Sequence, residues 1–482
     1  MNPTHLDPTS APIYECCLEF IQHRYAPFYC PGHKGGRTLE PKFAASMASF
    51  DLSNLPSTDT LHCPTGAILR GECLLAKAYG VDKSFILVGG STLGNLTSLL
   101  ATVKPGEAIL AQRNSHKSII AGIIQAGVKP IWLYPHYDAD FGIAHGISAA
   151  QLQEALQLHP DVRAICLLHP TYYGTVADLR ALAEISRRHR KILLVDEAHG
   201  SHFHFHNDLP IAAEDVGADM IVQSTHKTLS ALSQGSVLHL NSRQINEGSV
   251  RKVLQLLQTT SPNYAIMSSI DLARRQMVLQ GHERLSKTLA LSRRAREELS
   301  LLPGLKLLSN EATRGEGSGF FHLDETKLLI DTSGLGLSGY EALTFLIHHG
   351  IQPELAGPTY VLCIFSIGTS DEDIDKLLSA MRMMVATRDL KELKAPRYSN
   401  LPPEIEMIPR DAFYAPSLRL PFKNCLGHTC AEVITPYPPG IPILMPGEKI
   451  SKEILEWLET IKRANNPISA SDPYLESIEV VK

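Results

Sequence analysis

Between residues 84 and 224, the sequence predicts an α/β fold in which a mainly parallel sheet is covered by helices on both faces. Short apolar runs recur there with segments of helical spacing between them, which is typical of strand–helix alternation. Clusters of polar residues stand directly after the apolar runs. Because the carboxyl ends of parallel strands share one edge of a sheet, where such folds bind ligands, we expect the clusters to form one site.

The remaining elements are predicted in chain order around this sheet. Its strands are expected at 85–88, 107–111, 129–134, 162–168, 191–196 and 220–224, and its helices at 92–103, 117–127, 148–158 and 178–189. Downstream, 241–300 is mostly helical, the strand-like segments 320–331 and 360–367 flank a helix at 340–350, and a last helix occupies 452–464. We therefore divide the chain into an N-terminal arm or small lobe (1–75), a large domain (76–300) and a C-terminal α+β domain (301–482) that contains a proline-rich block.

Composition excludes several classes of protein. The chain has 482 residues, 44% of them hydrophobic, and a formal net charge of −5, so no basic field favours nucleic acid or anionic lipid. No apolar run is long enough to span a bilayer, and the opening residues lack the pattern of a secretory signal. Nine cysteines without a CxxC pair indicate neither a zinc site nor a disulfide framework. We expect a cytoplasmic protein.

Two charged residues follow neighbouring predicted strands. Asp196 ends a very apolar strand and Lys227 follows the next one, so both are expected out of water, where an unpaired charge is costly. A buried salt bridge between them is one interpretation. The other is a pyridoxal phosphate site, in which Lys227 forms a Schiff base and Asp196 pairs with the protonated pyridine nitrogen. Burial would lower the pKa of Lys227 and supply a neutral, nucleophilic amine.

Other polar residues of the same edge could complete such a site. Ser91 and Thr92 begin a predicted helix and either bind phosphate with its free N–H groups or simply cap it. His116 either lies flat on the cofactor ring or is an ordinary core histidine. Ser224 and His226 adjoin the lysine and either bind phosphate or cap the following helix.

A run of alternating histidines, HFHFH, is predicted to place His202, His204 and His206 on one face of a strand. Such a row could suggest a metal site, but no carboxylate or cysteine completes a convincing ligand set. A structural role is the preferred interpretation, and no metal is expected.

Several long motifs resemble the Orn/Lys/Arg decarboxylases, a fold-type I family that depends on pyridoxal phosphate. The resemblance covers most of the chain, and the motifs stand in the expected order. They are YCPGHKGG (29–36), DTLHCPTGAI (59–68), RNSHKS (113–118), HPTYYGTVADL (169–179), VDEAHGSHFHFH (195–206), STHKTLSALSQGS (224–236), TTSPNY (259–264), IQPE (351–354) and TPYPPGIPILMPGE (435–448).

The resemblance implies a role for each candidate residue. Lys227 would carry the cofactor, Asp196 would pair with its ring nitrogen and His116 would stack on its ring. The other expected contacts are Ser91, Thr92, Ser224 and His226 at the phosphate, and Ala198 and His199 near the ring. The resemblance also implies a homodimer with shared active sites, which the N-terminal arm and the TTSPNY loop would complete.

The implied reaction is decarboxylation of a basic L-amino acid to a polyamine precursor and CO2. Arginine or lysine is favoured and ornithine remains open. An acidic residue should bind the distal cation of the substrate: Glu354 is the first candidate, followed by Asp59 and Glu432, although each could instead be a surface acid or a helix cap. Lys227 and His226 are both candidates for reprotonating the α-carbon.

The chain also departs from the large members of the family. Only about 28 residues precede PGHKGG, so we expect the short class, which lacks the N-terminal wing domain. Thr65 and His428 stand where an acidic residue and an arginine are expected.

Another fold-type I enzyme, such as an aminotransferase or a lyase, would share Asp196 and Lys227 without needing PGHKGG. A catalytically silent regulatory paralogue would not need to keep Lys227, Asp196 and His116 together.

Overall fold

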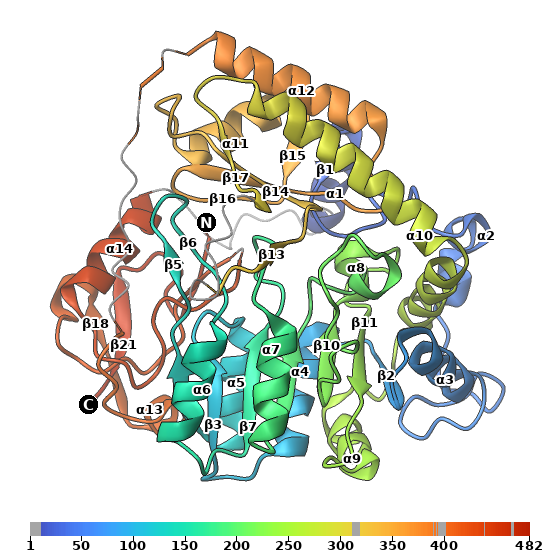
Figure 1. Cartoon of the computed structure of the whole chain (residues 1–482), viewed down its shortest axis with the longest axis vertical. Helices are drawn as coiled ribbons and strands as arrows, with labels where there is room; N and C mark the ends of the chain where they lie inside the picture. Colours follow the sequence, from blue (N-terminus) through green and yellow to red (C-terminus); the bar gives the residue numbers. More distant parts are fainter. Residues whose placement is uncertain are drawn as a thin grey trace.

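The computed structural model describes residues 11–310, 319–388, 390, 391, 393, 402–437, 439–463 and 467–482. Its centre is a seven-stranded sheet with the strand order β2-β11-β10-β9-β7-β3-β4 (Figure 1). These strands are β2 (Lys83–Leu87), β3 (Ala108–Gln112), β4 (Lys129–Leu133), β7 (Ala164–Leu168), β9 (Ile192–Asp196), β10 (Met220–Gln223) and β11 (Ser236–Leu240). Every pairing from β4 to β10 is parallel, which confirms the predicted α/β fold.

Helices cover both faces of the sheet. α4 (Gly90–Thr102), α5 (Lys117–Ala126) and α9 (Glu247–Leu257) pack on one face, and α6 (Ala149–Leu158) and α7 (Leu179–Arg188) on the other. Successive strand residues alternate between the two cores: Leu194 belongs to the first and Leu193 to the second. A strand that is apolar on both faces reads as a continuous apolar run, which explains why the strands could be predicted.

One strand of the sheet, β11, was missed by the sequence prediction. It runs antiparallel to β10 and β2. Its sequence, SVLHL, contains His239, which suggests a polar break in an apolar run. In the structure this ring is fully buried between Ser84 Oγ, 2.8 Å from its Nδ1, and Gln223 Oε1, 3.3 Å from its Nε2.

The N-terminal residues contribute separate short elements: α1 (Pro12–Gln22), β1 (Ala26–Phe28), α2 (Pro41–Ala45) and α3 (Ala67–Tyr79). β1 pairs in parallel with β15 (Ile351–Pro353), more than 300 residues later in the chain. α3 packs with the long helix α10 (Tyr264–Ser300) beside β2.

Two further hydrophobic clusters follow the central sheet. The first surrounds α11 (Gly339–His348), α12 (Asp371–Ala386) and a four-stranded sheet of β12 (Lys306–Leu307), β14 (Lys327–Asp331), β17 (Tyr360–Ile364) and β16 (Leu355–Ala356). The second lies around α14 (Lys452–Arg463), β18 (Ser417–Pro421) and β21 (Ser477–Val481). The proposed division at residues 75 and 300 stays a prediction.

The predicted strand through the histidine run is wrong. The chain turns there, because the Phe203 N–H donates to Gly200 O, and it then forms the short 3-10 helix η3 (Phe203–Phe205). The three rings consequently contact different partners: His202 Nε2 lies 3.4 Å from Asp324 Oδ1, His204 Nδ1 2.9 Å from Asp215 Oδ1 and His206 Nε2 2.9 Å from Ser286 Oγ. Among the described residues, no group of three or more potential ligands could hold a metal ion.

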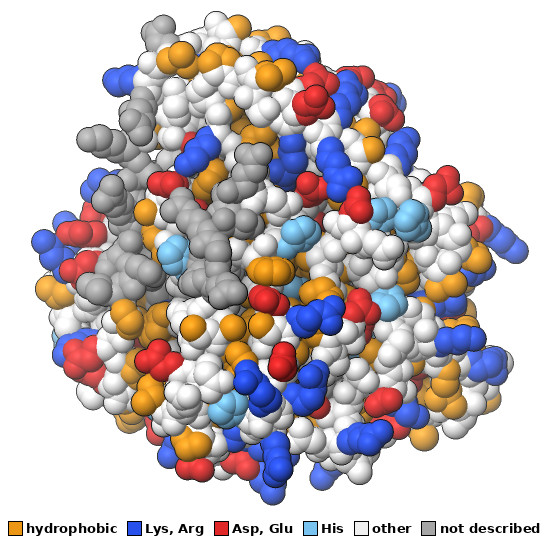
Figure 2. Space-filling view, viewed as in Figure 1, with side chains coloured by type: hydrophobic (Ala, Val, Ile, Leu, Met, Phe, Trp, Pro, Cys, Tyr) orange, Lys and Arg blue, Asp and Glu red, His pale blue; other side chains and the backbone are white. Residues whose placement is uncertain are grey.

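The described surface is of mixed charge. On the face drawn in Figure 2, basic and acidic side chains are interspersed. Within the described ranges, no helix is long and apolar enough to cross a membrane.

Two buried glutamates lie directly behind the end of β9. Gln223 Nε2 donates to Glu197 Oε2 at 2.7 Å and to Glu214 Oε2 at 3.2 Å, and the Ala213 N–H donates to Glu197 Oε1 at 2.8 Å. Burial raises the pKa of both carboxyl groups, and their mutual repulsion raises that of Glu197 further. The folded protein therefore keeps a proton on this pair at a pH where the unfolded chain has lost it.

We predict that Glu214→Gln makes the protein less sensitive to alkaline pH. A raised carboxyl pKa contributes stability at low pH that is lost as the pH rises above about 4.5, at up to about 1.4 kcal/mol per pH unit. The amide needs no proton, so the thermal midpoint should fall less between pH 6 and pH 8 than in the wild type, by about 1–3 °C. Glu184→Gln, on the exposed face of α7, is the control; equal pH dependence in all three proteins would contradict the prediction.

Candidate active site

A cavity of about 370 Å³ lies at the carboxyl edge of the central sheet. The loops that follow the strands position its residues: Ser91 and Thr92 begin α4 after β2, His116 caps α5 after β3, and Lys227 lies on α8 (Thr225–Thr228) after β10. All nine residues predicted to contact the cofactor line this cavity: Ser91, Thr92, His116, Asp196, Ala198, His199, Ser224, His226 and Lys227.

Asp196 is held in place by two donors. Asn95 Nδ2 donates to its Oδ2 at 2.8 Å and the Ala198 N–H donates to its Oδ1 at 3.1 Å. Burial raises the pKa of the Asp196 carboxyl, whereas Lys227 and the two donors lower it. A buried carboxylate is thus aimed into the cavity with capacity left for a cation. Sequence analysis missed Asn95, because a single polar residue inside a helix carries no distinctive signal.

Lys227 contacts a histidine instead of forming a simple salt bridge. Its Nζ lies 2.9 Å from His199 Nε2 and 5.9 Å from the centre of the Tyr172 ring, and no ion pair joins it to Asp196 among the described residues. Burial lowers the pKa of Lys227 and, together with the Lys227 charge, lowers that of His199 well below its usual range. A neutral imidazole therefore accepts a hydrogen bond from the amine.

His116 belongs to the same polar network as Asp196. Its Nδ1 lies 2.8 Å from Ser118 Oγ, and Asn95 Nδ2 donates to that hydroxyl at 2.9 Å as well as to Asp196. Burial, with the charges of Lys227 and Lys117, lowers the pKa of His116 to about 3, so its ring is neutral at physiological pH. Its Nδ1 also accepts from the Ser118 N–H and caps α5.

The start of α4 offers donors for an anion. No described side chain caps this helix. The Gly90 N–H donates to Gln234 O at 3.0 Å, and the N–H groups that follow it in the first turn are open to a ligand. Ser91 Oγ lies 2.6 Å from Ser224 Oγ, and both residues line the cavity. Neither Ser91 nor Ser224 caps its own helix, which leaves phosphate binding as the better interpretation of the two. His226 Nδ1, by contrast, lies 2.9 Å from Gly235 O.

The PGHKGG segment packs against the lysine-bearing loop. The Gly32 N–H donates to His226 O at 2.8 Å, and a Cβ at Gly32 would lie 2.5 Å from Leu229 O, so only glycine allows this approach. On its other side, Ser366 Oγ donates to Gly32 O at 2.6 Å. The segment therefore joins the lysine loop to the loop after β17.

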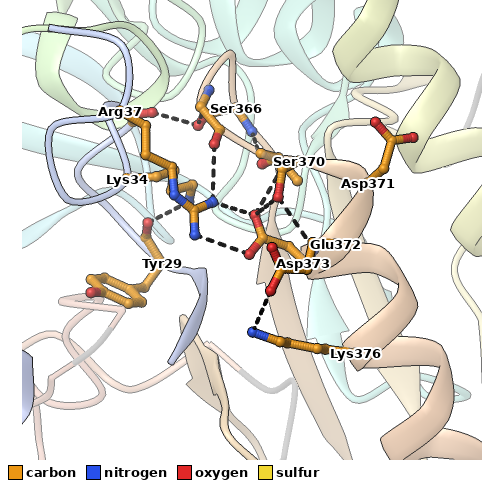
Figure 3. A network of polar contacts seen from close by, with 12 residues as sticks. Tyr29, Lys34, Arg37, Ser366, Ser370, Asp371, Glu372, Asp373 and Lys376 are labelled. Atoms are coloured by element: carbon orange, nitrogen blue, oxygen red, sulfur yellow. Dashed lines mark hydrogen bonds and ion pairs between the residues drawn. The ribbon is translucent and has the colours of Figure 1, made fainter. Parts of the chain in front are cut away.

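Charged side chains fix this segment (Figure 3). Lys34 Nζ donates to the carbonyls of Tyr29 and Ile364, and burial lowers its pKa to about 8. Arg37 forms an ion pair with Asp373, whose carboxylate also accepts from Ser370 at the start of α12. These contacts give the charged residues of the PGHKGG motif a structural role, and Lys34 does not line the cavity.

The three acids predicted to bind substrate have different surroundings. Glu354 lies just behind the cavity wall: the hydroxyl of Tyr172, which lines the cavity, donates to its Oε1, and the Cys30 N–H donates to its Oε2 at 2.8 Å. Asp59 holds its own loop together, accepting from the N–H groups of Thr60, Thr65, Gly66 and Ile68.

Glu432 is also occupied elsewhere. Its oxygens accept from the N–H groups of Ser471 and Glu479, both at 2.7 Å, within the C-terminal cluster. Neither Asp59 nor Glu432 lines the cavity that the described residues form.

Comparison with known proteins agrees with this geometry. Residues 11–373 match the Orn/Lys/Arg decarboxylase major domain, and residues 391–470 match the C-terminal domain of the same family. Arginine decarboxylase from Bacillus subtilis is 34% identical over 480 residues, which are 98% of each chain. Constitutive lysine decarboxylase from Escherichia coli is 24% identical, over 94% of this chain and 78% of the relative.

A solved structure supports the fold. The lysine decarboxylase of Francisella novicida superposes with a TM-score of 0.75 at 24% identity, over 98% of this chain and 83% of that one. Because one family's models match most of the sequence and a relative matches 98% of its length, the chain belongs to the Orn/Lys/Arg decarboxylase family.

Proposed function

We propose that the chain decarboxylates L-arginine with pyridoxal phosphate bound in the cavity around Lys227. Membership of the Orn/Lys/Arg decarboxylase family makes it a decarboxylase of a basic amino acid. Arginine is favoured because the B. subtilis relative with that activity in its name shares more identity than the E. coli lysine decarboxylase does. The single observation that carries the proposal is the convergence of Lys227, Asp196 and an uncapped helix start on one cavity.

The donors of the cavity fit this cofactor. Ser91, Thr92 and the N–H groups of α4 would hold the phosphate, Asp196 the pyridine nitrogen and Lys227 the aldehyde carbon. His199 Nδ1 is buried without a hydrogen-bond partner among the described residues, as expected where a polar ligand is missing. When bound, the cofactor supplies an electron sink for the electron pair of the bond that breaks when the substrate carboxylate leaves.

The protein's own residues would control charge and geometry. Asp196 holds a proton on the ring nitrogen, because a buried carboxylate stabilises a cation beside it. His116, neutral and packed in the cavity wall, supports one face of the ring and excludes water there. The pocket must also hold the bond to the carboxylate perpendicular to the ring, since orientation selects decarboxylation over the other reactions of the same cofactor.

Lys227 is the group we propose for reprotonating the α-carbon. With the substrate amine on the cofactor, the Nζ of Lys227 would be free to hold a proton near the α-carbon, and His199 Nε2, 2.9 Å away, would orient it by accepting a hydrogen bond. His226 was the alternative from sequence. Its Nδ1 is engaged by Gly235 O, and burial lowers its pKa to about 4, which makes it a poorer proton reservoir.

Glu354 is the acid we propose for the distal cation. A phenol oxygen can accept one hydrogen bond while donating another. The Tyr172 hydroxyl would accept a hydrogen bond from the substrate guanidinium while it donates one to Glu354. The negative charge of Glu354 would thus stabilise the guanidinium through this hydroxyl.

A second copy of the chain would complete the site. The N-terminal arm and the TTSPNY loop form one surface unit, since Asn54 Nδ2 donates to Thr260 O at 2.8 Å and His62 Nε2 lies 2.9 Å from Thr259 O. α1 buries none of its residues, and Ile13 is 83% exposed. An apolar helix left on the surface favours a homodimer in which these segments meet the partner.

The function is tested by measuring amine and CO2 released from arginine, lysine, ornithine and a neutral amino acid, with added pyridoxal phosphate. We expect release from arginine with kcat/KM at least about tenfold above that for lysine. Preference for lysine or ornithine would correct the substrate. No release from any, with the cofactor bound, would point to a silent paralogue or another pyridoxal phosphate reaction.

We predict that Lys227→Ala abolishes covalent attachment of the cofactor. The visible absorbance that borohydride fixes to the wild-type protein should be absent, and turnover should fall at least about 10³-fold, because the amine is both attachment point and proton carrier. Lys129→Ala, on the opposite edge of the sheet, is the control and should behave as wild type. A borohydride-fixed cofactor in the Lys227 variant would place the attachment elsewhere.

We predict that Glu354→Gln weakens substrate binding by removing one charge. KM for arginine should rise about 10- to 100-fold, the loss expected for a charge-assisted hydrogen bond, with little change in cofactor absorbance. Tyr172→Phe should act in the same direction because it breaks the link to the cavity. Glu432→Gln, whose carboxylate accepts two N–H groups away from the cavity, should leave KM unchanged; the reverse pattern would transfer the role to Glu432.

A further inference from the structure

The proline-rich block of the C-terminal region reaches into the active site. Tyr437, Pro439 and Ile441 line the same cavity as Lys227. The Lys117 N–H donates to Gly440 O at 2.9 Å, and Lys117 Nζ lies 5.2 Å from the centre of the Tyr437 ring. Tyr437 and residues 439–441 therefore line one side of a cavity whose other sides are formed by loops of the central sheet.

Gly440 touches the ring of His116. A Cβ at this position would lie 2.8 Å from both Cδ2 and Nε2 of His116, closer than real Cβ atoms come. The Nδ1 side of the same ring is held by Ser118 Oγ at 2.8 Å. The imidazole is thus confined between the hydroxyl of Ser118 and the bare backbone of Gly440, so its position depends on both.

A buried ion pair fixes the proline-rich block to the loop that carries His116. Arg113 donates from Nε to Glu448 Oε1 and from Nη2 to Glu448 Oε2, both at 3.0 Å. Its Nη1 donates to Pro442 O at 2.8 Å and its Nη2 to Ile443 O at 3.2 Å. The side chains are 10% and 2% exposed. A planar, bidentate contact with both partners buried defines one relative position, which a surface pair would not.

We propose that Tyr437 and residues 439–448 are a positioning element of the active site, in which Gly440 sets the position of the His116 ring and the Arg113–Glu448 pair sets the position of Gly440. Because His116 supports the ring of the cofactor, this element controls how tightly the cofactor is held. The proposal rests on the proposed function, since it assigns His116 to that ring. It makes Gly440, Arg113 and Glu448 positioning residues, which act on the cofactor through His116.

The test compares two alanine substitutions in the holoenzyme. Gly440 has φ +83° and Gly106 has φ +85°, so alanine meets the same backbone strain at both sites, but nothing lies within 4 Å of a Cβ at Gly106. Gly440→Ala should raise the dissociation rate of pyridoxal phosphate about tenfold and change the visible circular dichroism of the bound cofactor. Gly106→Ala should leave both as in the wild type.

Each outcome of this comparison is decisive. Equal dissociation rates of pyridoxal phosphate from the two variants would overturn the proposal, because backbone strain alone would then explain any faster dissociation. An unchanged circular dichroism spectrum of the bound cofactor in Gly440→Ala would overturn it as well. A wild-type protein that binds no pyridoxal phosphate would instead refute the proposed function, and this is measured before any variant is compared.

The anchor is tested by a double-mutant cycle. Glu448→Gln keeps the shape of the side chain but leaves Arg113 without its charge partner, so cofactor dissociation should again be faster. If the block acts as one unit, Gly440→Ala combined with Glu448→Gln should be little worse than the more severe single variant. Independent, multiplicative effects on the dissociation rate would show that the ion pair does not act through Gly440.

Discussion

The candidate active site depends on keeping two ionisable groups out of water at the ends of neighbouring strands. Asp196 and Lys227 are costly where they lie, and they are tolerated because the surroundings are polar at defined points: Asn95 and the Ala198 N–H on the carboxylate, His199 on the amine. The groups do not neutralise one another directly. The carboxylate and the amine are therefore both available to a ligand, which distinguishes this arrangement from a structural salt bridge.

The rest of the cavity is assembled around these two groups from distant parts of the chain. The PGHKGG segment braces the lysine loop through Gly32 and presents the Cys30 N–H to Glu354. The proline-rich block closes the opposite side, next to His116. Neither segment supplies a reactive group, yet each touches a residue that does. Family motifs without obvious chemistry thus have a physical role, which is to hold the chemical groups in place.

The sequence predicted most of the fold and nine of the residues that line the cavity, because both are encoded locally. Strands buried on two faces are continuous apolar runs, and charged residues at their ends are conspicuous. The failures have equally physical causes. Because of His239, the β11 segment reads as polar and was not predicted as a strand. The alternation in HFHFH is typical of a strand, but the chain turns at Gly200. Asn95 carried no signal within its helix, and the sequence did not reveal the backbone N–H groups that bind Asp59 and Glu432 away from the cavity.

The contact between Arg113 and Glu448 spans 335 residues of sequence and has a consequence for biosynthesis. A chain emerging from the ribosome can form the central sheet once about half of it has been made, since β11 ends at Leu240. The wall beside His116 cannot form until the proline-rich block has left the exit tunnel. Domains fold in order of synthesis, so a nascent chain passes through a stage with the lysine and its carboxylate in place but the cavity open on one side. On the proposed function, cofactor captured at that stage would lack the wall beside His116 and would be held by the loops of the sheet alone.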